Sequence, residues 1–175
     1  RLFNATTNEF IGSDEYNDIG IAPNKTFIVA KFGRAGVVDE TGKSLIPAIF
    51  NNISFANGFY ITELNNQRGL FDGEGKKIFD PEYSSITVEK DSLIILSQES
   101  DTSRYQANKL YAYPDGFLFS NNKGSISICD PNTFIIQEGN LCRLVDRTKT
   151  QLASPYTQIF KSINNLFERS EEHTS

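Results

Sequence analysis

The sequence lacks the side chains from which most catalytic and metal sites are made. It contains one histidine, His173, two cysteines, and no methionine or tryptophan. A histidine-based catalytic triad or a histidine-rich metal site has almost no raw material in such a chain. We therefore expect that the protein is not an enzyme and that it carries no cofactor.

The two cysteines, Cys129 and Cys142, form no CxxC motif and are too few for a disulfide scaffold in 175 residues. They would pair only if neighbouring strands bring them together, and we expect two free, small apolar side chains. This cysteine content suits either the cytoplasm or the cell envelope and leaves the compartment open. Because the chain starts at Arg1 and has no methionine, we expect a fragment or a processed product.

An excess of basic charge is also missing. The 17 basic and 22 acidic residues leave a net charge of −5, whereas a nucleic-acid binder needs a basic face to displace counterions from phosphates. We therefore expect no nucleic-acid binding. No run approaches the roughly 20 apolar residues that span a bilayer, so we also expect no membrane insertion. The 38% of apolar residues is enough for a folded domain.

What the sequence does contain is an internal repeat. The segment Gly36–Ile53 aligns without a gap with Gly69–Ile86, at an offset of about 33 residues. The residues that define this repeat are Gly36 with Gly69, Asp39 with Asp72, Gly42 with Gly75, Lys43 with Lys76, Phe50 with Tyr83, and Ile53 with Ile86. Fainter copies follow around Tyr113 and Asp146 and precede around Asp14–Ile19. Five units result, at about 1–31, 32–64, 65–98, 105–138 and 139–168.

The repeat unit has the pattern of strands and hairpin turns. Short apolar runs alternate with turn residues, and the "DETGK" and "DGEGK" segments combine an aspartate with a glycine that tolerates positive φ. Helical periodicity is nearly absent. We predict an all-β fold of tandem repeats of about 33 residues, in which antiparallel β-meanders or hairpins stack as a solenoid or a propeller-like array.

At these residues the sequence resembles the WG-containing repeat family of bacterial proteins. "RAGVVDETGKSLIPAIFNNI" (Arg34–Ile53) and "QRGLFDGEGKKIFDPEYSSI" (Gln67–Ile86) match most of that family's unit. Ala35 and Arg68 stand where the family has its tryptophan. The resemblance implies a β-rich module with a scaffold or interaction role, and it implies no catalytic residues.

The last residues form a separate segment. "RSEEHTS" (Arg169–Ser175) resembles the translation of a common sequencing-adapter oligonucleotide. We therefore expect residues 1–168 to form the repeat array and residues 169–175 to be a tail foreign to the natural protein.

Three functions remain open. The main expectation is a non-catalytic scaffold that binds a protein partner. The alternative is carbohydrate or cell-envelope binding through exposed aromatic rings, for which the best candidates are Tyr60, Tyr105, Tyr111 and Tyr113. The array, with no activity of its own, could also flank an enzyme domain. Acidic residues at the hairpin tips show no calcium-loop spacing and fit solvated turns.

Overall fold

The fold is all-β, as predicted. A computed structural model describes residues 1–11, 14–98, 107–121, 124–152, 158–161 and 167–170. Within these residues the single helix is a short 3-10 turn, Lys90–Ser92, and no helix is long and apolar enough to cross a membrane. The chain divides into two compact units, Arg1–Ile86 and Thr87–Ser175.

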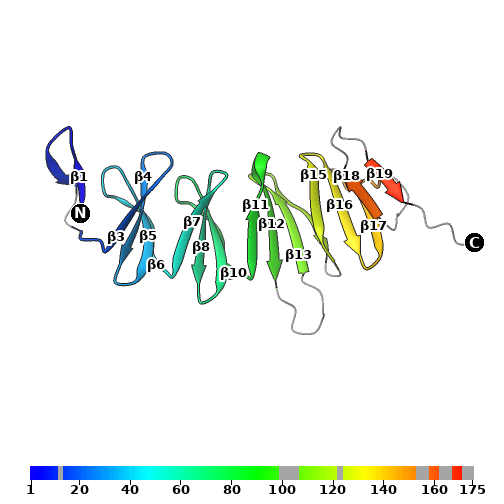
Figure 1. Ribbon diagram of the computed structural model, residues 1–175, viewed down its shortest axis with the longest axis horizontal. Helices are drawn as coiled ribbons and strands as arrows, with labels where there is room; N and C mark the ends of the chain where they lie inside the picture. Colours follow the sequence, from blue (N-terminus) through cyan, green and yellow to red (C-terminus); the bar gives the residue numbers. More distant parts are fainter. Residues whose placement is uncertain (12–13, 99–106, 122–123, 153–157, 162–166, 171–175) are drawn as a thin grey trace, which may run out of the picture. The chain divides into compact units, whose positions relative to one another are not determined.

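The first unit contains one hairpin and two four-stranded meanders, drawn in blue to green in Figure 1. The hairpin pairs β1 (Leu2–Asn4) with β2 (Glu9–Ile11). The first meander consists of β3 (Asp18–Ala22), β4 (Thr26–Lys31), β5 (Arg34–Asp39) and β6 (Ser44–Phe50). The second meander consists of β7 (Asn52–Ala56), β8 (Phe59–Leu64), β9 (Gln67–Asp72) and β10 (Lys77–Tyr83). In both meanders each strand pairs antiparallel with its chain neighbour.

The second unit repeats the arrangement less regularly. A third meander consists of β11 (Ser85–Val88), in which the division between the units falls, β12 (Leu93–Gln98), β13 (Ala107–Ala112) and β14 (Gly116–Asn121). A three-stranded sheet follows with β15 (Ile126–Asp130), β16 (Thr133–Glu138) and β17 (Leu141–Asp146). A last hairpin pairs β18 (Gln158–Lys161) with β19 (Phe167–Ser170), and residues 171–175 of the expected foreign tail lie outside the described residues.

The sheets divide the chain at other residues than the expected units. The meanders run from Asp18 to Phe50, from Asn52 to Tyr83 and from Ser85 to Asn121. A repeating sequence can be divided into units at any residue of the repeat, so the expected units and the observed sheets describe the same alternation of strands and turns. The sheets are the physical units, because hydrogen bonds join the strands of each meander.

In three of the sheets one aspartate holds the turn that follows the third strand, which is β5, β9 or β17. Asp39 accepts hydrogen bonds at Oδ1 from the backbone N–H groups of Thr41 (2.8 Å) and Lys43 (3.0 Å). Asp72 does the same for residues 74 and 76, and Asp146 for residues 148 and 150. The carboxylate thus satisfies amides that the tight turn leaves without a ladder partner.

The same turn needs one residue with positive φ. Gly42 and Gly75 fill this position with φ of 83° and 84°. In the β15–β17 sheet Lys149 takes this position, with φ of 72°. This copy therefore has the aspartate of the turn without the glycine.

The fourth strand of the first two meanders bulges over a glycine of the third strand. Val37 pairs with Ile46 and Ala35 with Phe50, so residues 46–50 of β6 span only residues 35–37 of β5. Residues 79–83 of β10 span residues 68–70 of β9 in the same way. Each bulge contains a proline, at position 47 or 81, and bulges are among the few places where a sheet tolerates proline.

The bulge explains why the repeat keeps its first glycine. A Cβ atom on Gly36 would lie 2.8 Å from the backbone N and Cα of Ala48. A Cβ atom on Gly69 would lie 2.9 Å from the carbonyl oxygen of Phe79. Real Cβ contacts are longer than this, so only glycine lets the two backbones approach.

Of the remaining repeat-defining side chains, Lys43 and Lys76 are exposed and the apolar and aromatic ones form the core. Phe50, Ile53, Tyr83 and Ile86 are all buried. In the first unit Phe50 packs edge-on against Phe71 of the next meander, with ring centroids 5.8 Å apart. One buried cluster therefore joins the β3–β6 and β7–β10 sheets, and its buried members are Ala22, Val37, Ile46, Phe50, Ile53, Tyr60 and Phe71. Both cysteines are buried and, as expected, form no disulfide with each other.

We predict that Gly69→Ala destabilises the protein by about 1–3 kcal/mol, because the added methyl group must displace the β10 backbone. Urea unfolding followed by circular dichroism measures the effect. Gly20→Ala is the matched control, since the nearest atom to its Cβ lies 3.8 Å away and φ is not positive. Equal losses for the two variants would contradict the role of the bulge.

A buried hydroxyl gives a second prediction, in the direction of higher stability. Thr62 is fully buried opposite Gly69, and its Oγ1 has no hydrogen-bond partner among the described residues. In the first meander the same place, opposite Gly36, holds the buried Val29. Thr62→Val keeps the shape and removes a desolvated hydroxyl, so we expect a gain of about 1 kcal/mol in the free energy of unfolding. A loss of stability would show that the hydroxyl has a partner.

Candidate functional site

The predicted aromatic surface is only partly present. Tyr60 is fully buried, which corrects the expectation of an exposed ring. Its hydroxyl lies 2.5 Å from Oγ1 of Thr26, which itself donates to the carbonyl oxygen of Pro23 (2.6 Å). Tyr60 thus donates to Thr26 inside the core of the first unit. Tyr105 lies outside the described residues.

The other two tyrosines lie in the β13–β14 hairpin of the second unit. Tyr111 and Tyr113 are half-buried. The ring of Tyr111 packs edge-on against Phe117, with centroids 5.5 Å apart, and Phe117 is itself exposed. Lys149 places its Nζ 5.5 Å from the centroid of the Phe117 ring. The structure therefore adds Phe117 to this surface, a residue that the sequence does not single out because a phenylalanine in a strand is usually core.

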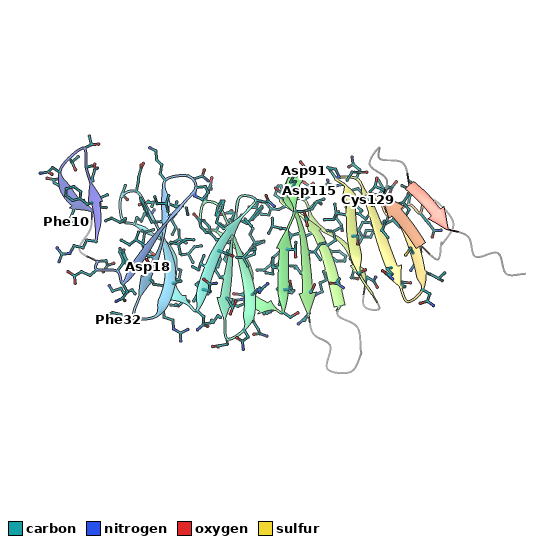
Figure 2. The ribbon with its side chains drawn as sticks, in the orientation of Figure 1. Phe10, Asp18, Phe32, Asp91, Asp115 and Cys129 are labelled. Carbon is teal, nitrogen blue, oxygen red and sulfur yellow. The ribbon has the colours of Figure 1, made fainter. Side chains whose placement is uncertain are left out.

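Among the residues whose burial the structure describes, the most exposed aromatic ring belongs to Phe32, which was not among the predicted surface residues. Phe32 occupies the β4–β5 turn with φ of 52°, and 88% of its surface is exposed. Figure 2 shows it at the end of the first meander, pointing away from the sheet. Its backbone N–H donates to Oδ1 of Asn17 (3.0 Å), and Lys31 lies beside the ring with Nζ 6.0 Å from the centroid.

The second meander has the same turn without the aromatic ring. Asn65 takes the place of Phe32, with φ of 53°, and its N–H donates to Oδ1 of Asn51 (2.9 Å). The offset of the repeat brings Phe32 onto Asn65 directly, so this signal was available in the sequence. Only the backbone conformation shows that the position is a turn with positive φ.

The second unit also contains an open pocket of about 660 Å³. It lies at the ends of β12 and β15, beside the β11–β12 turn, where Figure 2 labels Asp91 and Cys129. Four apolar side chains from the two strands line it: Leu93, Ile95, Ile126 and Ile128. Three carboxylates and one amine also line it: Glu89, Asp91, Asp130 and Lys90. No motif in the sequence marks this pocket.

Turn amides donate to three aspartates at the hairpin tips, Asp39, Asp72 and Asp146, and threonine hydroxyls also donate to the first and the last of them. The hydroxyl and backbone N–H of Thr41 lower the pKa of Asp39, and those of Thr148, with the N–H of Thr150, lower the pKa of Asp146. In the part of the chain that the structure describes, no group of three or more His, Cys, Asp and Glu side chains could hold a metal ion.

Comparison with known proteins supports the repeat assignment. Residues 36–67 match the family described as "WG containing repeat". This stretch begins at the glycine under the β6 bulge and ends at the start of β9. No curated protein gives a significant match.

Among solved structures, one match is described as "Crystal structure of the eukaryotic initiation factor". The identity is 14% and the TM-score is 0.45. The match covers 90% of this chain and 47% of the other, so the chain spans about half the length of that solved protein.

The aspartate turns predict a specific loss of stability in acid. A folded-state pKa that lies below the unfolded value of about 3.9 adds stability above that value, and this contribution disappears as the pH falls through the folded pKa. We expect wild type to be more stable than Asp39→Asn at pH 7 and the difference to shrink below about pH 4. Thermal unfolding across this pH range measures it, and a difference independent of pH would contradict the assignment.

Proposed function

We propose that this protein is a non-catalytic repeat module that binds a partner protein, with Phe32 as an anchor of the interface. The observation that carries the proposal is the display of Phe32. A phenylalanine with 88% of its surface exposed stands at the tip of a two-residue turn that favours asparagine or glycine.

Two physical costs make this placement informative. The left-handed backbone conformation costs an L-residue other than Gly, Asn or Asp about 1–2 kcal/mol. A large apolar ring exposed to water adds no hydrophobic free energy to folding, since that free energy comes only from buried area. The second meander avoids both costs with Asn65. Strained residues of this kind concentrate at functional sites, and an exposed aromatic ring is the usual anchor of a protein interface.

The fold is consistent with an array of mutually stabilising meanders that presents the Phe32 turn. Because one buried cluster joins the two meanders of the first unit, neighbouring meanders stabilise each other in the way of repeat proteins. We take the tandem arrangement to be a solenoid or a propeller-like array. Small-angle scattering separates these two, because a solenoid is the more elongated.

Phe32→Asn tests the interface without unfolding the protein. The variant copies Asn65 from the neighbouring repeat, so we expect it to be at least as stable as wild type. If Phe32 is an anchor worth about 2 kcal/mol, its loss lowers the affinity for the partner roughly 30-fold. The measurement is enrichment of the partner on the immobilised chain, followed by titration of the purified partner.

Ile21→Thr is the control for this experiment, since Ile21 is 90% exposed on β3 and is not at a turn. We expect it to bind like wild type. A partner that binds Phe32→Asn as tightly as wild type would overturn the proposal.

Carbohydrate binding is the second candidate, and the pairing of Tyr111 with the exposed Phe117 supports it. Aromatic faces of this kind can stack on a sugar ring. Glycan-array binding that Tyr111→Ala and Tyr113→Ala abolish would favour this function. An array without signal, together with loss of a protein partner in Phe32→Asn, would favour the protein interface.

A further inference from the structure

We propose that the pocket at the ends of β12 and β15 is a second binding site, which takes a segment of a partner protein carrying lysine or arginine next to large aliphatic residues. The site lies in the second unit, whereas Phe32 lies in the first. The proposal therefore goes beyond the Phe32 interface and can fail independently of it.

The base of the pocket is apolar and only partly covered. Leu93 and Ile126 belong to the buried core of the second unit. Ile95 and Ile128 pack against that core but remain half-exposed. Apolar surface in a concave site is covered best by the side chain of a ligand, and about 660 Å³ lies within the ordinary range of binding pockets.

The rim of the pocket is acidic. Glu89 and Asp91 are exposed, and Asp130 is half-buried with Oδ1 accepting from the N–H of Asn132 (2.8 Å). Among the described residues, none of these three carboxylates forms an ion pair. Lys90 is the one basic residue of the described lining. The lining therefore has an excess of negative charge.

A basic group beside the β15–β16 turn is already paired. Arg147 binds Oδ2 of Asp115 (2.6 Å) and donates its backbone N–H to the carbonyl oxygen of Asn132 (2.9 Å). It thus lies next to this turn without an ion pair to Asp91 or Asp130. The carboxylates of Glu89, Asp91 and Asp130 can therefore accept a cation from a binding partner.

The charge of the lining selects the occupant. Opposite charge across an interface speeds association and excludes wrong partners. A second copy of this chain, with its net charge of −5, is poorly suited. A basic segment with aliphatic side chains matches both the rim and the base.

The test uses the full chain and a fluorescein-labelled short peptide of alternating lysine and leucine, with fluorescence anisotropy as the readout. We expect saturable binding that weakens several-fold between about 50 and about 500 mM salt. A peptide of alternating glutamate and leucine should not bind. A peptide of alternating lysine and serine should bind at least about tenfold more weakly, because it lacks the apolar anchor.

The double variant Asp91→Asn, Asp130→Asn should weaken binding of the lysine–leucine peptide about tenfold. Asparagine tolerates the positive φ of Asp91 and keeps the acceptor for Asn132, so the fold is preserved. The matched control is Glu74→Gln with Glu82→Gln, which removes the same charge from residues of the first unit, outside the pocket, and should change nothing.

Three results would overturn the proposal. They are equal binding by the two double variants, equal binding of the glutamate–leucine peptide, and full displacement of the peptide by one equivalent of spermine, which would indicate a site for small cations. Phe32→Asn should leave peptide binding unchanged, so failure here and failure of the Phe32 interface are distinguishable.

Discussion

The close approach of two backbones over a glycine is the constraint on which the repeat depends. When β6 bulges over Gly36, it gains two residues on β5 and brings Phe50 opposite Ala35. Phe50 then enters the core between the two meanders, and the chain turns directly into β7. The second meander repeats the sequence of events with Gly69 and Tyr83. A side chain on the glycine would displace the bulged strand and loosen the packing of the aromatic ring.

This constraint also explains how far the sequence could predict the fold. Four positions of the repeat recur because each meets a requirement of the backbone or the core. Gly36 permits the close approach, Asp39 binds the turn amides, Gly42 takes the positive φ, and Phe50 fills the buried cluster. Such requirements show in one chain as identities at a fixed offset. The all-β class and the aspartate turns were therefore within reach of the sequence alone.

Exposure was less predictable, and Tyr60 shows why. In a strand with one face in water, neighbouring residues alternate between buried and exposed. Phe59 and Tyr60 are adjacent and both buried, since both faces of β8 are covered. The polar hydroxyl of Tyr60 does not keep the ring at the surface, because Thr26 provides a hydrogen-bond partner inside the core. Conversely, Phe32 looks like a core residue in the sequence and is exposed because its turn conformation directs it outward.

The two kinds of turn in the meander explain where function can arise. The turn after β5, β9 or β17 uses an aspartate side chain to satisfy backbone amides, so replacing Asp39, Asp72 or Asp146 removes those hydrogen bonds. The short turns between the earlier strands require chiefly a residue with positive φ. The residues that adopt it are Asn24, Phe32, Asn57, Asn65 and Asp91. The residue type differs among these positions, which hold asparagine, phenylalanine or aspartate. Phe32 and Asp91, which carry the two proposed binding sites, stand at turns of this permissive kind. A repeat protein with this architecture can therefore acquire new surfaces by substitution at these tips, while the glycine under the bulge and the aspartate turn keep the sheets in register.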